Sequence, residues 1–174
     1  LFANLFFTNS AFTQIAIRGT SLIGSTTSGN GANLTISKPA GVVTGDVMIV
    51  NISQYGFTSA PTLSGWTEID WRQLNASPRF GTVLYKVATA SEPPSDTFTL
   101  NGNNGLGTYA TAGTIIAFSG VDATGGVKQD GTPGGPFDSD PGTISTGGTT
   151  TVSANSIVTN TANAEFVMFA MASA

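Results

Sequence analysis

Acidic side chains are the groups of this sequence best suited to chemistry. Its 174 residues include ten Asp and Glu, six Lys and Arg, and neither histidine nor cysteine. Without histidine, a Ser-His-Asp triad and a His-ligated zinc site are excluded, and without cysteine so is a Cys-His pair. Two kinds of carboxylate chemistry remain: paired acids for glycoside hydrolysis, and oxygen ligands for calcium.

Four carboxylates are candidates for acid–base work, namely Glu68 with Asp70, and further along the chain Glu92 and Asp96. Glu68 and Asp70 are two residues apart in an alternating segment, 67–73, which predicts that they share one exposed strand face. Arg72 continues that face and is expected to pair with them. Charges arranged in this way usually solvate a surface, so we predict a protein that is not an enzyme and has no catalytic residue.

Calcium is the inorganic ion that this composition favours, because it binds through oxygen alone. Four candidate ligands lie in or beside a segment rich in Gly, Pro, Ser and Thr: Asp122, Asp130, Asp138 and Asp140. Residues 138–142 (DSDPG) resemble a turn that directs two carboxylates inward, although the spacing is not that of an EF-hand. The alternative is that each Asp begins a turn by bonding its own backbone. No other cofactor is predicted.

Two tryptophans are candidates for contact with carbohydrate or with a protein partner. Trp66 and Trp71 are five residues apart, so on one continuous strand they would point to opposite faces. We expect one of them in the core, and the other is the candidate for stacking on a sugar ring. The alternative is that both pack inside.

Short strands joined by tight turns must position these residues. Alternating or dense apolar runs predict strands at residues 15–18, 33–37, 46–52, 67–73, 82–88, 95–100, 109–119, 149–153, 156–159 and 165–172. The run 46–52 (DVMIVNI) is typical of a central strand covered on both faces. Gly113 is expected to mark a bulge. A long loop is expected at 125–148, and no amphipathic helix is found. The pattern predicts an all-β fold, an antiparallel β-sandwich of jelly-roll or immunoglobulin-like type, over residues 15–174.

Residues 1–14 form a region of their own. Residues 1–12 read LFANLFFTNSAF, which is too short and too interrupted by polar residues to span a membrane. The segment fits a remnant of a secretory signal peptide, or a retained strand that pairs with a neighbouring subunit; a plain first strand is the alternative. In the donor-strand case, subunit contacts are expected from Leu1, Phe2, Leu5, Phe6 and Phe7. An extracellular or cell-surface location follows.

The charge pattern argues against nucleic acid as a partner. The formal net charge is −4, and the six basic residues are spread along the chain. Binding to duplex nucleic acid requires a clustered basic face that displaces counterions. We therefore expect no nucleic-acid partner.

A succession of short motifs resembles a known domain. The motifs are residues 38–41 (KPAG), 45–50 (GDVMIV), 64–67 (SGWT), 84–88 (LYKVA), 91–93 (SEP), 97–99 (TFT) and 116–122 (IAFSGVD). Their order, over about residues 33–172, resembles a repeated β-sandwich domain of large bacterial surface proteins, especially of Bacteroidetes, and of phage tail-associated proteins. The resemblance implies an extracellular adhesive or structural module without enzymatic activity, and it supplies no binding residues.

The same resemblance implies further strands after the segment that matches 165–174. We therefore expect the domain to be incomplete at its C-terminal end, and its open edge to be closed by further residues or by a neighbouring copy. Head-to-tail closure of that kind generates filaments.

The sequence thus favours one function and leaves two alternatives. The favoured function is a non-enzymatic structural or adhesive subunit of a bacterial surface fibre or large adhesin, which self-associates as a homo-oligomer or filament. The first alternative is a carbohydrate-binding module of a secreted enzyme, with a surface polysaccharide as partner. The second is a phage tail or virion surface protein.

Overall fold

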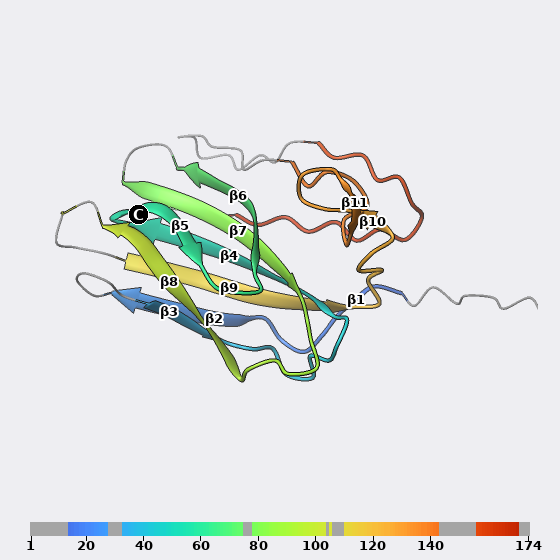
Figure 1. Cartoon of the computed structure of the whole chain (residues 1–174), viewed down its shortest axis with the longest axis horizontal. Helices are drawn as coiled ribbons and strands as arrows, with labels where there is room; N and C mark the ends of the chain where they lie inside the picture. The colour runs from blue at the N-terminus through green and yellow to red at the C-terminus, as the bar shows by residue number, and fades with distance from the viewer. Residues whose placement is uncertain are drawn as a thin grey trace, which may run out of the picture.

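A computed structural model describes residues 14–27, 33–74, 78–103, 105, 110–142 and 156–170. In these residues the chain forms antiparallel strands and no helix (Figure 1). The predicted all-β class is confirmed. A helix able to cross a membrane is likewise absent from the described part of the chain.

The larger sheet contains six strands. Their order is β1 (Ala16–Ile17), β9 (Ala110–Ser119), β4 (Val47–Tyr55), β7 (Arg79–Val87) and β6 (Thr67–Gln73), with β2 (Leu22–Thr27) also paired to β9. Strand β4 lies at the centre, where Ile49 is opposite Tyr85 on one side and Ile116 on the other. The prediction that this apolar run forms a central strand is confirmed.

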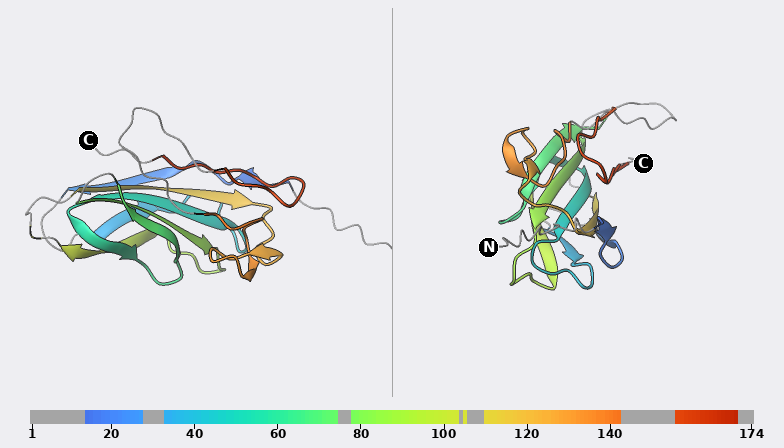
Figure 2. Two further views of the ribbon diagram at one scale, coloured as in Figure 1. Left: turned by 90° about the horizontal axis from the view of Figure 1, so that it is seen from above. Right: turned by 90° about the vertical axis from the view of Figure 1, so that its right-hand side faces the viewer.

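The smaller sheet consists of β3 (Asn33–Ser37), β8 (Ser95–Asn103) and β5 (Phe57–Thr62). Strand β5 follows β4 after a single residue, Gly56, whose φ of 90° lets the chain turn sharply from one sheet into the other. The smaller sheet lies against one face of the larger one, so the strands form two layers (Figures 1 and 2). Two short strands, β10 (Gly126–Val127) and β11 (Pro133–Gly135), pair separately.

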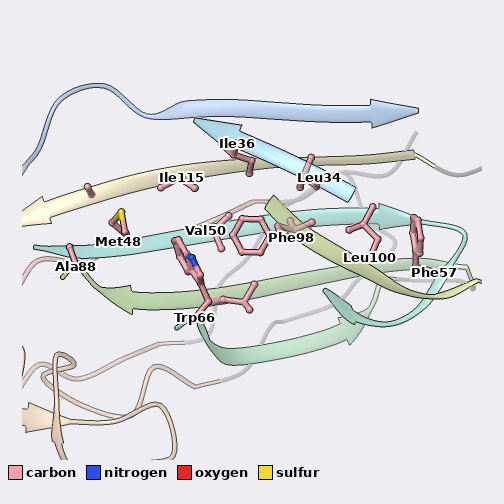
Figure 3. Close-up of a cluster of buried hydrophobic side chains, with 13 residues drawn as sticks. Leu34, Ile36, Met48, Val50, Phe57, Trp66, Ala88, Phe98, Leu100 and Ile115 are labelled. Atoms are coloured by element: carbon pink, nitrogen blue, oxygen red, sulfur yellow. The ribbon is translucent and has the colours of Figure 1, made fainter. Parts of the chain in front are cut away.

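The main core lies between the two layers (Figure 3). Alternation along β4 points Met48, Val50 and Ile52 inward, and all three are fully buried. Phe98 of the smaller sheet is also fully buried at the centre of this cluster. We call the whole cluster the inner core. Its remaining members are Leu34, Ile36, Phe57, Trp66, Leu84, Ala88, Leu100, Ile115 and Ala117.

Two strands of the main sheets, β2 and β5, have no counterpart among the predicted ones, and the short strands β10 and β11 lie inside the loop expected at 125–148. The first, β2, has Gly24 in its interior, where a Cβ would lie 2.4 Å from the carbonyl oxygen of Thr35. The glycine that weakens the strand signal is therefore the residue that lets β2 cross β3 closely. The second, β5, contains Pro61, which is tolerated because β5 is an edge strand of its sheet.

Two predicted strands near the C-terminus are wrong. Residues 156–159, and the described part of the second, 165–170, form no strand. At 165–170, alternation places Val167 and Phe169 toward the larger sheet, where they are partly buried. A strand also requires a neighbouring edge to bond, and these residues pass over the face of the larger sheet (Figure 2). The predicted strand at 149–153 lies outside the described residues.

The expected bulge at Gly113 is also absent, because the pairing of β9 with β2 and β4 continues in register through this residue. A Cβ at Gly113 would lie 3.0 Å from the carbonyl oxygen of Asn51 and 3.1 Å from Ile36 Cδ1. The glycine therefore provides room for close packing of the smaller sheet.

An ion pair fixes the beginning of the described chain to the larger sheet. Arg18 Nε and Nη2 donate to the two carboxylate oxygens of Asp46 over 2.9 and 3.1 Å. The backbone N–H of Arg18 also donates to Ala117, and that of Val43 to Asp46 Oδ2. Because Asp46 is buried, this two-point contact ties the residue that follows β1 to the residue that precedes β4.

Candidate association surface

The outer face of the larger sheet, opposite the inner core, is also apolar. Four of its side chains are buried: Val47, Ile49, Tyr85 and Phe118. They come from β4, β7 and β9, the same strands that supply the inner core from their other faces. A sheet with two apolar faces requires a second cover.

Segments that do not pair with the larger sheet provide this cover. We call residues 121–142 and 156–170 together the outer cover; Val121, Phe137, Val167 and Phe169 from it pack against the sheet. The Phe137 ring meets that of Tyr85 edge to face, with centroids 4.9 Å apart.

A groove remains between the sheet and the outer cover. Its volume is about 740 Å³, and its lining includes Ile15, Ile49, Ile69, Val83 and Phe169. Phe166 and Met168 also contribute to its wall, yet their side chains remain 56% and 55% exposed. An apolar groove with exposed apolar residues at its wall is a feature typical of an association surface. We call it the outer groove.

Asp138 holds the two parts of the outer cover together. Its carboxylate accepts hydrogen bonds from the backbone N–H of Asn160 and from the hydroxyl of Thr161, and its carbonyl accepts one from Asn160 Nδ2 at 3.0 Å. The bonds from Thr161 and Asn160 lower the pKa of Asp138 below its ordinary value. The ionised carboxylate is thus the form that joins residue 138 to residues 160–161.

The other three predicted calcium ligands lie in local turns. Asp122 Oδ1 accepts the N–H groups of Thr124 and Gly125, Asp130 Oδ1 accepts both donors of Thr132, and Asp140 Oδ1 accepts the N–H of Gly142. These hydrogen bonds lower the pKa of Asp122 and Asp130. Among the described residues, no group of three or more acidic side chains is arranged to hold a metal ion. These hydrogen bonds are the ones expected if each Asp begins a turn, which is the alternative to calcium binding. Calcium binding stays a prediction.

The two tryptophans are both packed against aromatic rings. Trp66 is 8% exposed, its ring meets the edge of Phe98, and its Nε1 donates to Asp96 Oδ1 over 3.0 Å. Trp71 is half-buried and stacks on Phe80 with centroids 4.7 Å apart. Trp66 is thus in the core as expected for one of the pair, and Trp71 has one ring face covered. Carbohydrate contact stays a prediction for both.

A β-bulge separates the carboxylates of Glu68 and Asp70. Pairing with β7 shifts between them, so that Glu68 lies opposite Leu84 of the inner core and Asp70 opposite Val83 of the outer face. The expectation of one shared face is therefore wrong. Arg72 Nε donates to Asp70 over 3.1 Å, which confirms the expected pairing. Burial, and secondly the charge of Asp70, raise the pKa of Glu68.

Glu92 and Asp96 do not form an open acid pair but belong to a buried cluster with a lysine. Lys86 Nζ lies 2.5 Å from Glu92 Oε2 and 3.9 Å from Asp96 Oδ1. The Lys86, Glu92 and Asp96 side chains are only 11%, 3% and 1% exposed. Sequence reasoning missed Lys86, although its position between Leu84 and Ala88 in an alternating strand placed it on their face.

The predicted subunit contacts Leu1, Phe2, Leu5, Phe6 and Phe7 lie outside the described residues. Comparison with known proteins adds no relative: no family model matches the sequence, no curated protein is similar to it, and no solved structure matches its fold.

Proposed function

We propose that this chain is a non-enzymatic structural or adhesive module of an extracellular surface assembly, and that it associates with further copies of itself through the outer groove. The observation that carries this proposal is the second apolar face of the larger sheet, which the outer cover leaves partly open. The resemblance of the ordered motifs to a domain of bacterial surface proteins supports the cellular setting.

The proposed occupant of the outer groove is the apolar segment 1–12 of a neighbouring copy. Five of its first seven residues are Leu or Phe, which suits an apolar lining. The groove is bordered by carboxylates, among them Asp70 and Asp138, and residues 1–12 carry no charged side chain that they would repel. Ile15, which follows this segment in the sequence, lines the groove of its own chain, so the same segment of the same copy is the alternative occupant that the experiment must separate. Association with a segment from another copy depends on protein concentration, whereas binding of a segment within one copy does not, and this difference separates the two.

Sedimentation velocity of the whole chain over a hundredfold range of concentration tests the proposal. We expect reversible assembly of the unaltered protein, and at least a tenfold weaker assembly for the double variant Phe166→Ser, Met168→Ser and for the double variant Phe2→Ser, Phe6→Ser. The matched control is Ile23→Ser, because Ile23 is 77% exposed and does not line the groove. A protein that stays monomeric throughout, or a control that weakens assembly equally, contradicts the proposal.

A further inference from the structure

The space between the two sheets contains a lysine as well as apolar side chains. Lys86 follows Leu84 at the spacing that directs both side chains inward, and the ring of Trp66 lies 5.9 Å from its Nζ. It faces Asp96, which points inward from the smaller sheet together with Phe98. An amine from one layer and a carboxyl group from the other therefore meet in the interior.

The charges of this cluster do not balance. One ammonium group faces two carboxylates, and the exposed fraction of each of the three side chains is 11% or less. Asp96 Oδ1 accepts the Trp66 N–H, but Asp96 Oδ2 has no hydrogen-bond partner among the described residues. A buried, incompletely satisfied carboxylate is costly, and a simple ion pair leaves that cost in place.

We propose that Lys86 and Asp96 become joined by an amide bond between Lys86 Nζ and Asp96 Cγ, with Glu92 as the group that transfers the protons. The three side chains supply the three roles that such a bond requires: a nucleophilic amine, a carboxyl carbon and a second carboxylate within hydrogen-bonding distance of the amine. Rotation about the terminal bonds of the lysine side chain brings Nζ from its 3.9 Å position beside Asp96 to the carboxyl carbon.

The step balances without any further reactant. Glu92 accepts a proton from the Lys86 ammonium, and the freed electron pair of Nζ forms the N–C bond at Asp96. The nitrogen then loses a second proton, the two protons pass through Glu92 to one Asp96 oxygen, and that oxygen leaves as water. Overall, one ammonium and one carboxylate become one amide and one water molecule, and Glu92 returns to its starting form.

The surroundings favour each part of this step. Burial raises the pKa of Glu92, but hydrogen bonds from Lys86 and Thr89 outweigh it, so the pKa lies below its ordinary value and Glu92 is held in the ionised form beside the ammonium. The Trp66 N–H stabilises negative charge on the Asp96 oxygen as the amine attacks. Fixed proximity favours the reaction, and the neutral product removes two charges from the interior.

Asp96 rather than Glu92 is the carboxyl group that reacts. Both donors of Thr89, the N–H at 2.7 Å and the hydroxyl at 2.9 Å, hold Glu92 Oε1 in the turn between β7 and β8. Asp96 Oδ2 has no partner among the described residues and is available to leave, whereas Glu92 Oε2, which also has no hydrogen bond, is in contact with the Lys86 ammonium. The resulting bond would fasten the two layers together covalently at one end of the inner core.

Mass spectrometry of the purified whole chain tests this inference. The intact mass is expected to be lower than the sequence mass by one water molecule. Trypsin should no longer cleave after Lys86, so that residues 80–128 appear as one product, also lighter by one water. Fragmentation of that product should show a branch joining Lys86 to Asp96.

Variants distinguish the amide from other losses of water, such as cyclisation at Asp130–Gly131. Lys86→Arg and Asp96→Ala are each expected to restore the full mass, and Glu92→Gln to restore it in most of the protein while keeping the size of the side chain. The matched control, Lys38→Arg, should retain the deficit. Circular dichroism verifies that each sample is folded. Folded unaltered protein of full mass that is cleaved after Lys86, or a deficit that persists in Lys86→Arg, would overturn the inference.

Discussion

The inner core and the outer face use the same three strands but differ in what covers them. Between the sheets, β4, β7 and β9 meet a hydrogen-bonded sheet, and side chains such as Phe98, Leu34 and Ile36 are 0% exposed. On the outer face the same strands meet the outer cover, in which Phe166 and Met168 stay more than half exposed. Both faces are thus apolar, but one is covered by a regular sheet and the other by segments without strand pairing to it.

This difference teaches that the pattern of apolar residues along a strand determines which faces of a sheet must be covered. It does not determine how tightly the cover packs. A sheet brings its side chains to the interface at fixed spacing, because its backbone bonds hold neighbouring strands in register. Residues 156–170 have no such ladder, and we expect them to open at a much lower free energy than the strands do. The groove is a consequence of that loose cover.

The largest expected effect contrasts one phenylalanine from each region. Phe98→Ala removes a fully buried ring from the inner core and is expected to lower the free energy of unfolding by about 3–5 kcal/mol. Phe169→Ala removes a half-buried ring from the outer cover, where the cost is expected to be about 1 kcal/mol. Urea denaturation of both variants measures the difference. Equal losses would show that the outer cover is packed as tightly as the inner core.

The next effect tests the close crossing at the edge of the inner core. In Gly24→Ala the added methyl group meets the Thr35 carbonyl oxygen, and the backbone must shift, at an expected cost of about 1–3 kcal/mol. The neighbouring exposed position offers the control, Ser25→Ala, which is expected to change stability by less than about 0.5 kcal/mol. Thermal denaturation of both variants provides the measurement. A neutral Gly24→Ala would mean that the two strands are farther apart than described.

Acid should loosen the outer cover before the inner core. The pKa of Asp138 is lower in the folded protein than the value of about 3.9 for an unfolded chain, so its contribution to stability is present above that pH. The contribution is lost as pH falls through the folded pKa, because the protonated carboxyl no longer accepts both hydrogen bonds. Binding of a hydrophobic dye is therefore expected to rise below about pH 4 while the far-ultraviolet signal of the strands persists.

Substitution identifies the group responsible for this acid response. Asp138→Asn should bind the dye already at pH 7, whereas Asp140→Asn, whose hydrogen bond is confined to its own turn, should behave as the unaltered protein does. Simultaneous loss of strand signal and gain of dye binding would contradict the difference between the two regions.

The smallest effect concerns Glu68 beside the bulge. Its pKa is raised by burial and by Asp70, so the ionised form costs stability once the pH exceeds the folded pKa. Glu68→Gln is therefore expected to raise Tm at pH 7 by about 1 °C, and to have no such benefit below about pH 4. Differential scanning calorimetry measures it. Glu165→Gln, at an exposed position of the outer cover, provides the comparison.

Much of the inner core could be predicted from the sequence. Strict alternation predicted β3 at its observed bounds, and the apolar run of β4 predicted its central place. The wrong parts have physical causes. Alternation at 165–170 indicated which side chains face the larger sheet, but not whether a strand edge was free to pair. Gly24 weakened the signal of β2, because the close crossing with β3 requires a residue without a side chain.

The candidate sites were harder to predict because they depend on contacts between distant segments. A single bulge moved Asp70 away from the face of Glu68, and no residue type marks a bulge reliably. Lys86, Glu92 and Asp96 are spread over the end of one strand, a turn and the start of another strand. Only the packing of the two sheets brings their side chains together.

The ion pair between Arg18 and Asp46 has a mechanical consequence. Tension on the segment that precedes β1 would reach the domain first at the pairing of β1 with β9, and next at this ion pair and at the N–H of Arg18 bound to Ala117. The load is then shared between β9 and the residue that precedes β4. The load would therefore enter through the paired strands of the larger sheet, to which residues 156–170 have no backbone pairing.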